Sequence, residues 1–186
     1  DPLAYYRNNA MASCTLLQAA IDGGVGRFLY SGTSAVYGDP AENPVAETAA
    51  IVPKTPYGKS KLVLEHMLAD AAAVSDLDYV VLRYFNVAGA DPQARYGQST
   101  TRTTLLVQLA VQAALGRREG LTIFGTGYPT PDGTCVRDYL HVTDLIDAHE
   151  AALGYLRDGG KPETWNVGYG HGYSVRDIID TVKRVT

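Results

Sequence analysis

The sequence predicts an α/β protein with a doubly wound parallel sheet, of which this chain carries the C-terminal half, and a second, smaller α/β lobe. Residues 3–21 carry apolar side chains at helical spacing and end at a glycine pair. Residues 27–31 (RFLYS) then predict a short strand. The order repeats with a helix that starts at Pro56 after the N-cap Thr55, and a continuous apolar strand over residues 78–85. Alternating helices and strands are typical of a parallel sheet covered on both faces.

The second part of the chain has shorter predicted elements and longer loops. Residues 91–104 are polar and loop-like, and residues 125–138 form a loop rich in Gly, Pro and Thr. Ser174 and Asp177 resemble a capping box with Asp in place of Glu, which starts the last helix. The remaining predictions are helices over residues 105–115, 142–156 and 174–185 and strands over 121–124 and 164–167.

Composition narrows the possible classes of protein. The chain has 186 residues, 46% of them apolar and 19% charged, which is ordinary for a globular protein and argues against intrinsic disorder. A net charge of −4 argues against a nucleic-acid partner, and the absence of a long apolar run argues against a membrane. Cys14 and Cys135 are far apart, so we expect reduced thiols in a cytoplasmic protein. The chain begins Asp1-Pro2-Leu3 and is expected to be a piece of a longer protein.

Tyr57 and Lys61 lie four residues apart and therefore share one face of the predicted helix. An ammonium beside a phenol favours the phenolate. A tyrosine that acts as a base near pH 7 needs a pKa about three units below its usual value, or roughly 4 kcal/mol. The alternative is a surface pair worth a few tenths of a kcal/mol, which arises easily by chance in a chain with 13 tyrosines.

Hydroxyl-bearing residues follow the first predicted strand. The segment 31–38 (SGTSAVYG) lies at the carboxyl end of that strand, where open α/β sheets bind their ligands. A Thr33 hydroxyl at this edge could bond a substrate oxygen and relay its proton. The next strand ends in Tyr84, Phe85 and Asn86, at the same edge.

Four segments follow one another in a specific order: residues 31–38, 56–61 (PYGKSK), 82–89 (LRYFNVAG) and 132–142 (DGTCVRDYLHV). Together they resemble the UDP-glucose 4-epimerase family of the extended short-chain dehydrogenase/reductase superfamily, whose fold is Rossmann-like. The resemblance implies that residues 1–90 are the second half of an NAD-binding domain. It implies that residues 91–186 are mainly a UDP-sugar-binding lobe, interleaved with the first.

The resemblance also implies an NAD-dependent isomerase of carbohydrate metabolism. Such an enzyme epimerises C4 of a UDP-hexose, UDP-galactose to UDP-glucose, through transient oxidation to a 4-keto sugar. Tyr57 would take the proton of the sugar 4-hydroxyl, Lys61 would lower the pKa of Tyr57 and hold the nicotinamide ribose, and Thr33 would bridge Tyr57 and the hydroxyl. The other implied NAD contacts are Asn8, Ser31, Tyr84 and Phe85. The implied substrate contacts, besides Thr33, are Asn86, Leu121, Thr122, Phe124, Arg137, Tyr139 and Val175. By analogy with the family we expect a homodimer.

Several features depart from the family or suggest alternatives. Leu105 stands where the family commonly has a polar residue, and the Gly-rich phosphate-binding turn is not among these residues. A 4,6-dehydratase would need an Asp-Glu pair after Thr33, where this chain has Ser34 and Ala35. Two alternatives stay open: another nucleotide-sugar enzyme such as a decarboxylase, and a catalytically inactive fragment or binding relative. Residues 168–172 (GYGHG) imitate a dinucleotide-binding turn, but Tyr173 occupies its sixth position. The four histidines have no metal-ligand spacing, so we expect no metal.

Overall fold

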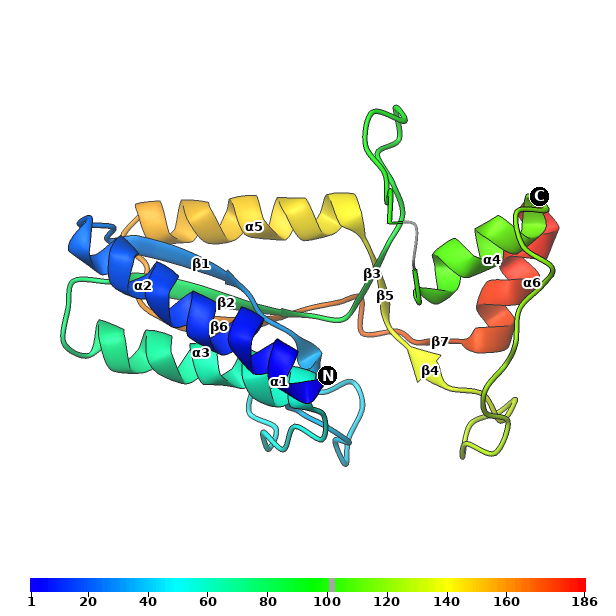
Figure 1. Ribbon diagram of the computed structural model, residues 1–186, viewed down its shortest axis with the longest axis horizontal. Helices are drawn as coiled ribbons and strands as arrows, with labels where there is room; N and C mark the ends of the chain where they lie inside the picture. Colours follow the sequence, from blue (N-terminus) through cyan, green and yellow to red (C-terminus); the bar gives the residue numbers. More distant parts are fainter. Residues whose placement is uncertain (101–102) are drawn as a thin grey trace. The chain divides into compact units, whose positions relative to one another are not determined.

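The computed structural model describes residues 1–100 and 103–186 (Figure 1). The chain forms two compact units, each built from two stretches. The first unit contains Asp1–Phe85 and Leu145–Val167, and the second contains Asn86–Asp144 and Gly168–Thr186. The α/β fold class with a parallel sheet, predicted from the sequence, is confirmed.

The first unit is built on a three-stranded parallel sheet in the order β1-β2-β6. Its strands are β1 (Arg27–Ser31), β2 (Asp78–Tyr84) and β6 (Glu163–Val167). The register places Ser31 opposite Leu82 and Tyr84 opposite Val167, so the carboxyl ends of neighbouring strands meet at one edge. The predicted strand over 27–31 is confirmed, and the strand predicted over 78–85 ends one residue earlier.

Helices cover both faces of this sheet, as Figure 1 shows. α2 (Ala12–Asp22) and α3 (Pro56–Ala72) lie on one face, and α5 (Val142–Arg157) lies on the other. Successive side chains of a strand point to opposite faces, so β2 contributes to two separate cores. The first core contains Leu17, Tyr30, Leu64, Leu68, Leu77 and Val81. The second contains Val80, Leu82, Ala152 and Leu156.

The N-terminal helix predicted over residues 3–21 is helical throughout but not uniform. It consists of α1 (Pro2–Tyr5), a π-helical segment (Tyr6–Met11) and α2. The wider π turn packs against α3, where Asn9 Nδ2 donates a 3.0 Å hydrogen bond to Ser60 Oγ. The predicted single α-helix is therefore corrected to a helix with a π-helical middle.

The start of α3 follows the prediction. Thr55 is the N-cap, and its Oγ1 accepts a 3.1 Å hydrogen bond from the backbone N–H of Gly58. Pro56 occupies the first helical position, where its missing N–H costs nothing. These two residues fix where α3 begins and therefore place Tyr57 in its first turn and Lys61 one turn later.

The second unit contains two helices and two short sheets. The helices are α4 (Leu106–Ala114) and α6 (Val175–Val185), and α6 has the predicted Ser174–Asp177 capping box. One sheet pairs β3 (Asn86–Ala88) in parallel with β5 (Tyr139–His141). The other pairs β4 (Val136–Arg137) antiparallel with β7 (Tyr173–Ser174).

Three predictions in this unit differ from the structure. Residues 121–124 were expected to be a strand, but they are irregular, and no strand of the described chain pairs with them. The predicted loop 125–138 contains β4 near its end. The predicted helix 105–115 is shorter by one residue at each end, since Leu105 is its N-cap without a side-chain hydrogen bond. The expected loop 91–104 includes Thr101 and Arg102, which lie outside the described residues.

Candidate functional site

The carboxyl edge of the first unit's sheet carries the polar cluster that the sequence predicts. Lys61, on α3, extends to the end of β1, where its Nζ donates a 2.8 Å hydrogen bond to the carbonyl oxygen of Ser31. The Tyr30 hydroxyl donates to the Lys61 carbonyl over 3.0 Å, and the Lys61 ammonium lies 4.6 Å from the centre of the Tyr30 ring. These contacts hold Lys61 at the edge of the sheet.

Lys61 is half-buried, and this environment shifts the pKa of its ammonium. Burial lowers the pKa of the Lys61 ammonium because it removes water from the charged form, and the nearby Glu65 carboxylate partly opposes that effect.

Tyr57 precedes Lys61 by one helical turn on α3, and Tyr84 ends β2 at the same edge of the sheet. Tyr57 is half-buried in the first turn of α3 and packs edge to face against Tyr5, with 5.8 Å between ring centres. Burial raises the pKa of Tyr84, the nearby charge of Tyr57 raises it further, and a hydrogen bond with the Ser31 side chain opposes both. The two phenols and Ser31 therefore belong to one cluster at the sheet edge.

Thr33 lies in the turn that follows β1. It is buried, with 7% of its surface exposed, and it is the N-cap of a 3₁₀-helix over Ser34–Val36. Its Oγ1 accepts a 3.2 Å hydrogen bond from the Ala35 N–H. Because a hydroxyl that accepts one bond can still donate its proton, Thr33 keeps the donor that proton relay needs.

His149 belongs to this cluster, although the sequence analysis considered it only as a metal ligand. Its Nδ1 lies 2.8 Å from the Leu145 carbonyl oxygen, and its Nε2 lies 2.9 Å from Ser31 Oγ. A carbonyl oxygen only accepts, so Nδ1 carries the hydrogen; in the neutral ring, Nε2 then accepts from the Ser31 hydroxyl. The position of His149 in α5, four residues after Leu145, is the only sequence signal, and it does not identify Ser31 as the partner.

The first unit brings some of the expected NAD contacts together and leaves others apart. Ser31, Lys61, Tyr57 and Tyr84 form the cluster described above. Phe85 is half-buried beside it, and its N–H donates to the Val167 carbonyl oxygen over 3.4 Å. Asn8 is exposed in the π-helical segment, where its neighbour Asn9 makes the contact with α3. No described contact links Asn8 to the cluster.

In the second unit, the two short sheets align four of the expected substrate contacts. The β3–β5 pairing places Asn86 opposite Tyr139. The β4–β7 pairing places Arg137 opposite Tyr173, and the Val175 N–H donates to the Cys135 carbonyl oxygen over 3.1 Å. Arg137 is exposed, and its Nη1 donates to the Val136 carbonyl oxygen over 2.8 Å.

The remaining expected substrate contacts lie on the irregular segment 121–124. The Phe124 ring is 97% exposed, so no described side chain covers it. Thr122 is also exposed, whereas Leu121 is half-buried. No described contact joins these three residues to Arg137 or Tyr139.

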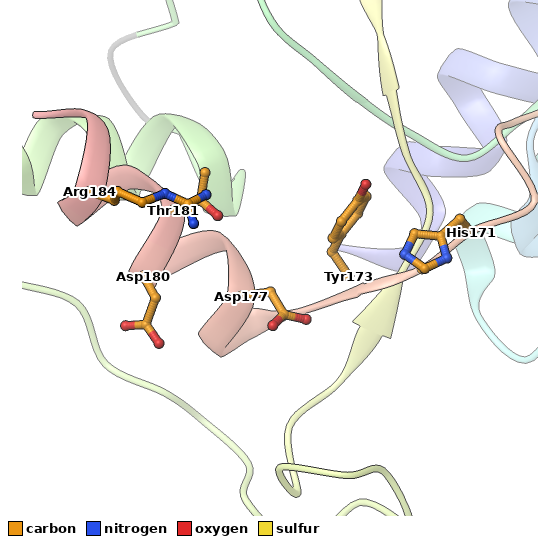
Figure 2. Close-up of a pocket in the computed structure, with 7 residues that line it drawn as sticks. His171, Tyr173, Asp177, Asp180, Thr181 and Arg184 are labelled. Atoms are coloured by element: carbon orange, nitrogen blue, oxygen red, sulfur yellow. The ribbon is translucent and has the colours of Figure 1, made fainter.

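A shallow pocket of about 450 Å³ lies beside α6 in the second unit (Figure 2). Its lining contains none of the residues that the sequence analysis expects to be catalytic or to contact NAD or substrate. It is lined by His171, Gly172, Tyr173, Asp177, Asp180, Thr181 and Arg184. Residues 168–172, which imitate a dinucleotide-binding turn in sequence, form a loop whose last two residues belong to this lining.

Residues 1–100 and 103–186 contain neither a candidate metal cluster nor a candidate membrane-spanning helix. In this range no group of three or more His, Cys, Asp or Glu side chains is arranged to hold a metal ion. No helix in the same range has both the length and the apolar character that crossing a membrane requires.

A parallel sheet with helices on both faces, and a Tyr-Lys pair at its carboxyl edge, defines the class of Rossmann-like nucleotide-binding enzymes. Comparison with known families narrows this class. The model of the NAD dependent epimerase/dehydratase family matches residues 1–168, and the chain belongs to that family.

Individual relatives agree with this membership. A UDP-glucose 4-epimerase of Azospirillum brasilense is 55% identical over 185 residues, which cover 100% of this chain and 53% of the relative. A solved UDP-glucose 4-epimerase of Brucella ovis in complex with NAD has a TM-score of 0.93 and 43% identity, over 99% of this chain and 57% of that one. A Stenotrophomonas maltophila UDP-glucose-4-epimerase with bound NAD and formylated UDP-arabinopyranose has a TM-score of 0.94 and 43% identity, over 100% of this chain and 56% of that one. The chain thus spans about half the length of the relatives that it matches.

Proposed function

We propose that the protein to which these residues belong is an NAD-dependent isomerase that epimerises C4 of a UDP-hexose, interconverting UDP-galactose and UDP-glucose. The observation that carries the proposal is the hydrogen bond from the Lys61 ammonium to the Ser31 carbonyl at the carboxyl edge of a parallel sheet. Tyr57 lies one turn before Lys61 on α3, and Tyr84 is grouped with Tyr57 and Ser31 at that edge. The relatives named above, with 43% to 55% identity over nearly all of this chain, support the same substrate class.

The chemistry assigned to the first unit is movement of one proton. Tyr57, as a phenolate favoured by the Lys61 ammonium, takes the proton of the sugar 4-hydroxyl and later returns it. Thr33 bridges the phenol and that hydroxyl through the donor that its Ala35 contact leaves available. The proton balance over one turnover is zero, so the site needs no external acid or base.

NAD fits the residues that this unit contributes. It would supply the redox step, because nicotinamide accepts a hydride from the sugar carbon and gives it back. Lys61 has three N–H donors, and Ser31 is its one hydrogen-bond acceptor among the described residues, which leaves donors for ribose hydroxyls. Ser31, Tyr84 and Phe85 would complete the nicotinamide end of the site, and Asn8 would join them from the π-helical segment.

The second unit is proposed to hold the UDP part of the substrate, consistent with assigning most of residues 91–186 to substrate binding. Arg137 would clamp the diphosphate, since its planar guanidinium suits phosphate oxygens, and Asn86 and Tyr139 would line the same site. Val175 adds a contact from the start of α6, and Leu121, Thr122 and Phe124 flank the uridine. Strong contacts to the nucleotide leave the sugar ring free to present either face.

A dehydratase or a decarboxylase on the same fold is the alternative. The two residues after Thr33 are Ser34 and Ala35, and neither can act as the carboxylic acid or carboxylate that elimination requires. This difference favours epimerisation over dehydration.

The protein is further proposed to be a cytoplasmic homodimer. Large apolar side chains stay exposed along the N-terminal helical segment, and they include Leu3 (63%), Met11 (65%) and Leu16 (59%). A second copy that packs against this segment would remove them from water. Light scattering of the complete polypeptide measures the mass, and a monomeric mass contradicts the dimer.

Proton NMR of UDP-galactose tests the proposed activity. The complete polypeptide is added in catalytic amount, with NAD but without a reductant, and the anomeric signals are followed. Appearance of UDP-glucose at constant total sugar nucleotide is expected. A folded protein that leaves UDP-galactose unchanged, or that forms a dehydrated product, contradicts the proposal.

A further inference from the structure

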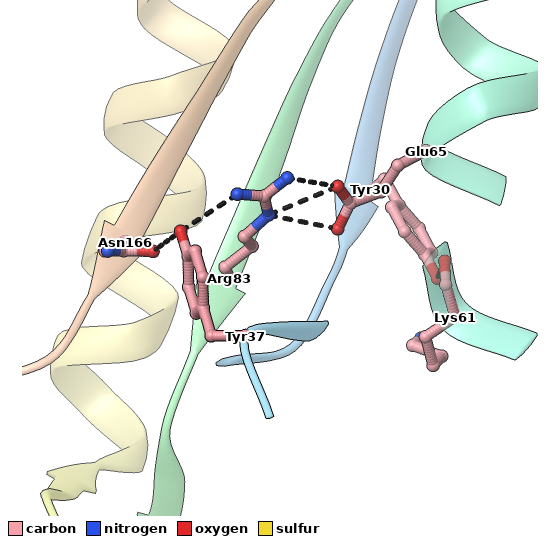
Figure 3. A network of polar contacts seen from close by, with 6 residues as sticks. All are labelled: Tyr30, Tyr37, Lys61, Glu65, Arg83 and Asn166. Atoms are coloured by element: carbon pink, nitrogen blue, oxygen red, sulfur yellow. Dashed lines mark hydrogen bonds and ion pairs between the residues drawn. The ribbon is translucent and has the colours of Figure 1, made fainter. Parts of the chain in front are cut away.

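A polar network crosses the sheet of the first unit from Glu65 on α3 through Arg83 on β2 to Asn166 on β6 (Figure 3). Its centre is Arg83 on β2, which is only 5% exposed. Arg83 Nε donates to both carboxylate oxygens of Glu65 at 3.2 Å, and Nη2 donates to Oε2 at 2.5 Å. On its other side, Nη1 donates to the Tyr37 hydroxyl at 2.9 Å. We call Glu65, Arg83, Tyr37 and Asn166 the Arg83 network.

The network continues to β6 and to the loop that contains Val45 and Glu47. The Tyr37 hydroxyl donates to Asn166 Oδ1 on β6 over 2.8 Å. Asn166 Nδ2 donates to the Val45 carbonyl oxygen over 2.9 Å, and its backbone N–H donates to Glu47 Oε1 over 2.8 Å. Each polar atom along this path has a partner, as burial requires.

Each arm of Arg83 ends next to a candidate catalytic group. Glu65 lies one turn after Lys61 on α3, and its charge favours the protonated form of Lys61. Tyr37 directly follows the 3₁₀-helix whose N-cap is Thr33. One guanidinium is therefore bonded to the helix that carries Tyr57 and Lys61 and to the turn that carries Thr33.

Stability alone is a weak explanation for the buried ion pair of Arg83 and Glu65. Removing two charges from water costs much of what their attraction returns, and apolar residues of similar volume often serve a core equally well. Arginine differs in what it can position, because its rigid fork holds two partners at a fixed angle, whereas the single ammonium of lysine does not.

A second contact joins the same two segments independently. A Cβ added to Gly58, in the first turn of α3, would lie 2.7 Å from the Ala35 carbonyl oxygen in the Thr33 turn. The helix and the turn thus touch backbone to backbone near Tyr57, and Arg83 joins them deeper in the sheet. Contacts at two levels restrain both their separation and their tilt.

We propose that Arg83 is a positioning residue, with Glu65 and Tyr37 as its two arms, and that it aligns the Tyr57–Lys61 helix with the Thr33 turn. This inference rests on the proposed function, because the aligned groups are those that share the sugar hydroxyl proton. Small displacements of such groups reduce turnover strongly while substrate contacts elsewhere persist.

The kinetic test compares three variants of the complete polypeptide with NAD. Tyr37→Phe removes one arm, and Arg83→Lys keeps the charge but removes the fork. Tyr79→Phe is the matched control, because Tyr79 is half-buried on the same strand near Glu65 but its hydroxyl lies outside the network. The first two variants are expected to lower kcat by about tenfold with KM unchanged, and the control is expected to match the parent. The double variant should be no slower than the slower single variant, since the two residues act as one unit.

Hydrogen–deuterium exchange provides a readout that does not depend on activity. Arg83→Lys is expected to increase exchange in residues 33–37 and 56–61 together, and Tyr37→Phe is expected to do the same to a smaller extent. A normal kcat in folded Tyr37→Phe overturns the proposal, and so does increased exchange in only one of the two segments. If Arg83→Lys does not fold, the kcat and exchange of Tyr37→Phe alone decide the question. If the parent protein leaves UDP-galactose unchanged, the proposed function fails. The exchange data then decide the positioning role alone: a joint increase in residues 33–37 and 56–61 supports it, and an increase in only one of them overturns it.

Discussion

The Nζ of Lys61 donates a 2.8 Å hydrogen bond to the carbonyl oxygen of Ser31. This contact joins α3 to the carboxyl end of β1, across the face of the sheet. It also explains why Lys61 lies at the sheet edge before any ligand binds, because a backbone carbonyl replaces part of the hydration that its charge loses. Because Tyr57 lies one turn earlier on the same helix, the contact that anchors Lys61 also restrains the position of Tyr57.

Replacement of Lys61 by methionine is expected to lower turnover by about one hundredfold or more, because the ammonium that favours the phenolate is lost. Burial lowers the pKa of Lys61, so the ammonium disappears at a lower pH than it does on an exposed lysine. Activity that needs the ammonium is present below this pKa and declines as pH rises through it. The pH–rate profile of Lys61→Met should lack that alkaline decline, and an unchanged profile would remove Lys61 from its role.

Two glycine substitutions, one where α3 approaches the Thr33 turn and one in open space on α5, are expected to have opposite effects on stability. Gly58→Ala forces a methyl group to within 2.7 Å of the Ala35 carbonyl oxygen, and it is expected to destabilise the protein by about 1–3 kcal/mol and to slow turnover. Gly154→Ala, in α5, meets no atom within 4 Å and is expected to stabilise by up to about 1 kcal/mol. Thermal and chemical unfolding measure both. Equal effects at the two positions would contradict the packing.

His149 is expected to donate from Nδ1 to the Leu145 carbonyl and to accept at Nε2 from the Ser31 hydroxyl. Nitrogen-15 NMR distinguishes the two neutral forms directly. His149→Phe should weaken NAD binding about fivefold, because the Ser31 hydroxyl loses the partner that orients it. His66→Phe, at an exposed position on α3, is the control. A hydrogen on Nε2, or NAD affinity equal to the control's, argues against this role.

Arg137 is exposed and bonds only a neighbouring carbonyl among the described residues, so its guanidinium keeps donors for a diphosphate. Arg137→Ala should weaken UDP binding by about tenfold or more, as expected when a charge-assisted contact is lost. The unfolding temperature should change little because the side chain covers no core. Calorimetry with UDP measures the affinity, and an unchanged value rules out the clamp.

The sequence predicted the parts of the fold that depend on local chemistry. Thr55 and Pro56 begin α3 as expected, and Ser174 and Asp177 form the expected capping box, because these residues satisfy the N–H groups of their own helix. The apolar runs of β1 and β2 predicted buried parallel strands, and both are present.

The parts that were missed depend on partners distant in the sequence. β3 and β5 have three residues each, too few to show a period, and they form only because Asn86–Ala88 pairs with Tyr139–His141. The segment 121–124 has the composition of a strand but no strand beside it in the described chain. The contact of His149 with Ser31 and the two arms of Arg83 join residues 18 to 118 positions apart, and no local pattern indicates either.

Tyr57 is the residue proposed to move the proton of the sugar hydroxyl. The most direct measurement is the rate at which the complete Tyr57→Phe polypeptide converts UDP-galactose, together with its bound NAD. A loss of about a thousandfold or more in rate with NAD still bound is predicted, because the aromatic ring and its packing on Tyr5 remain while the acid–base group is gone. Conversion at the parent rate would contradict the account.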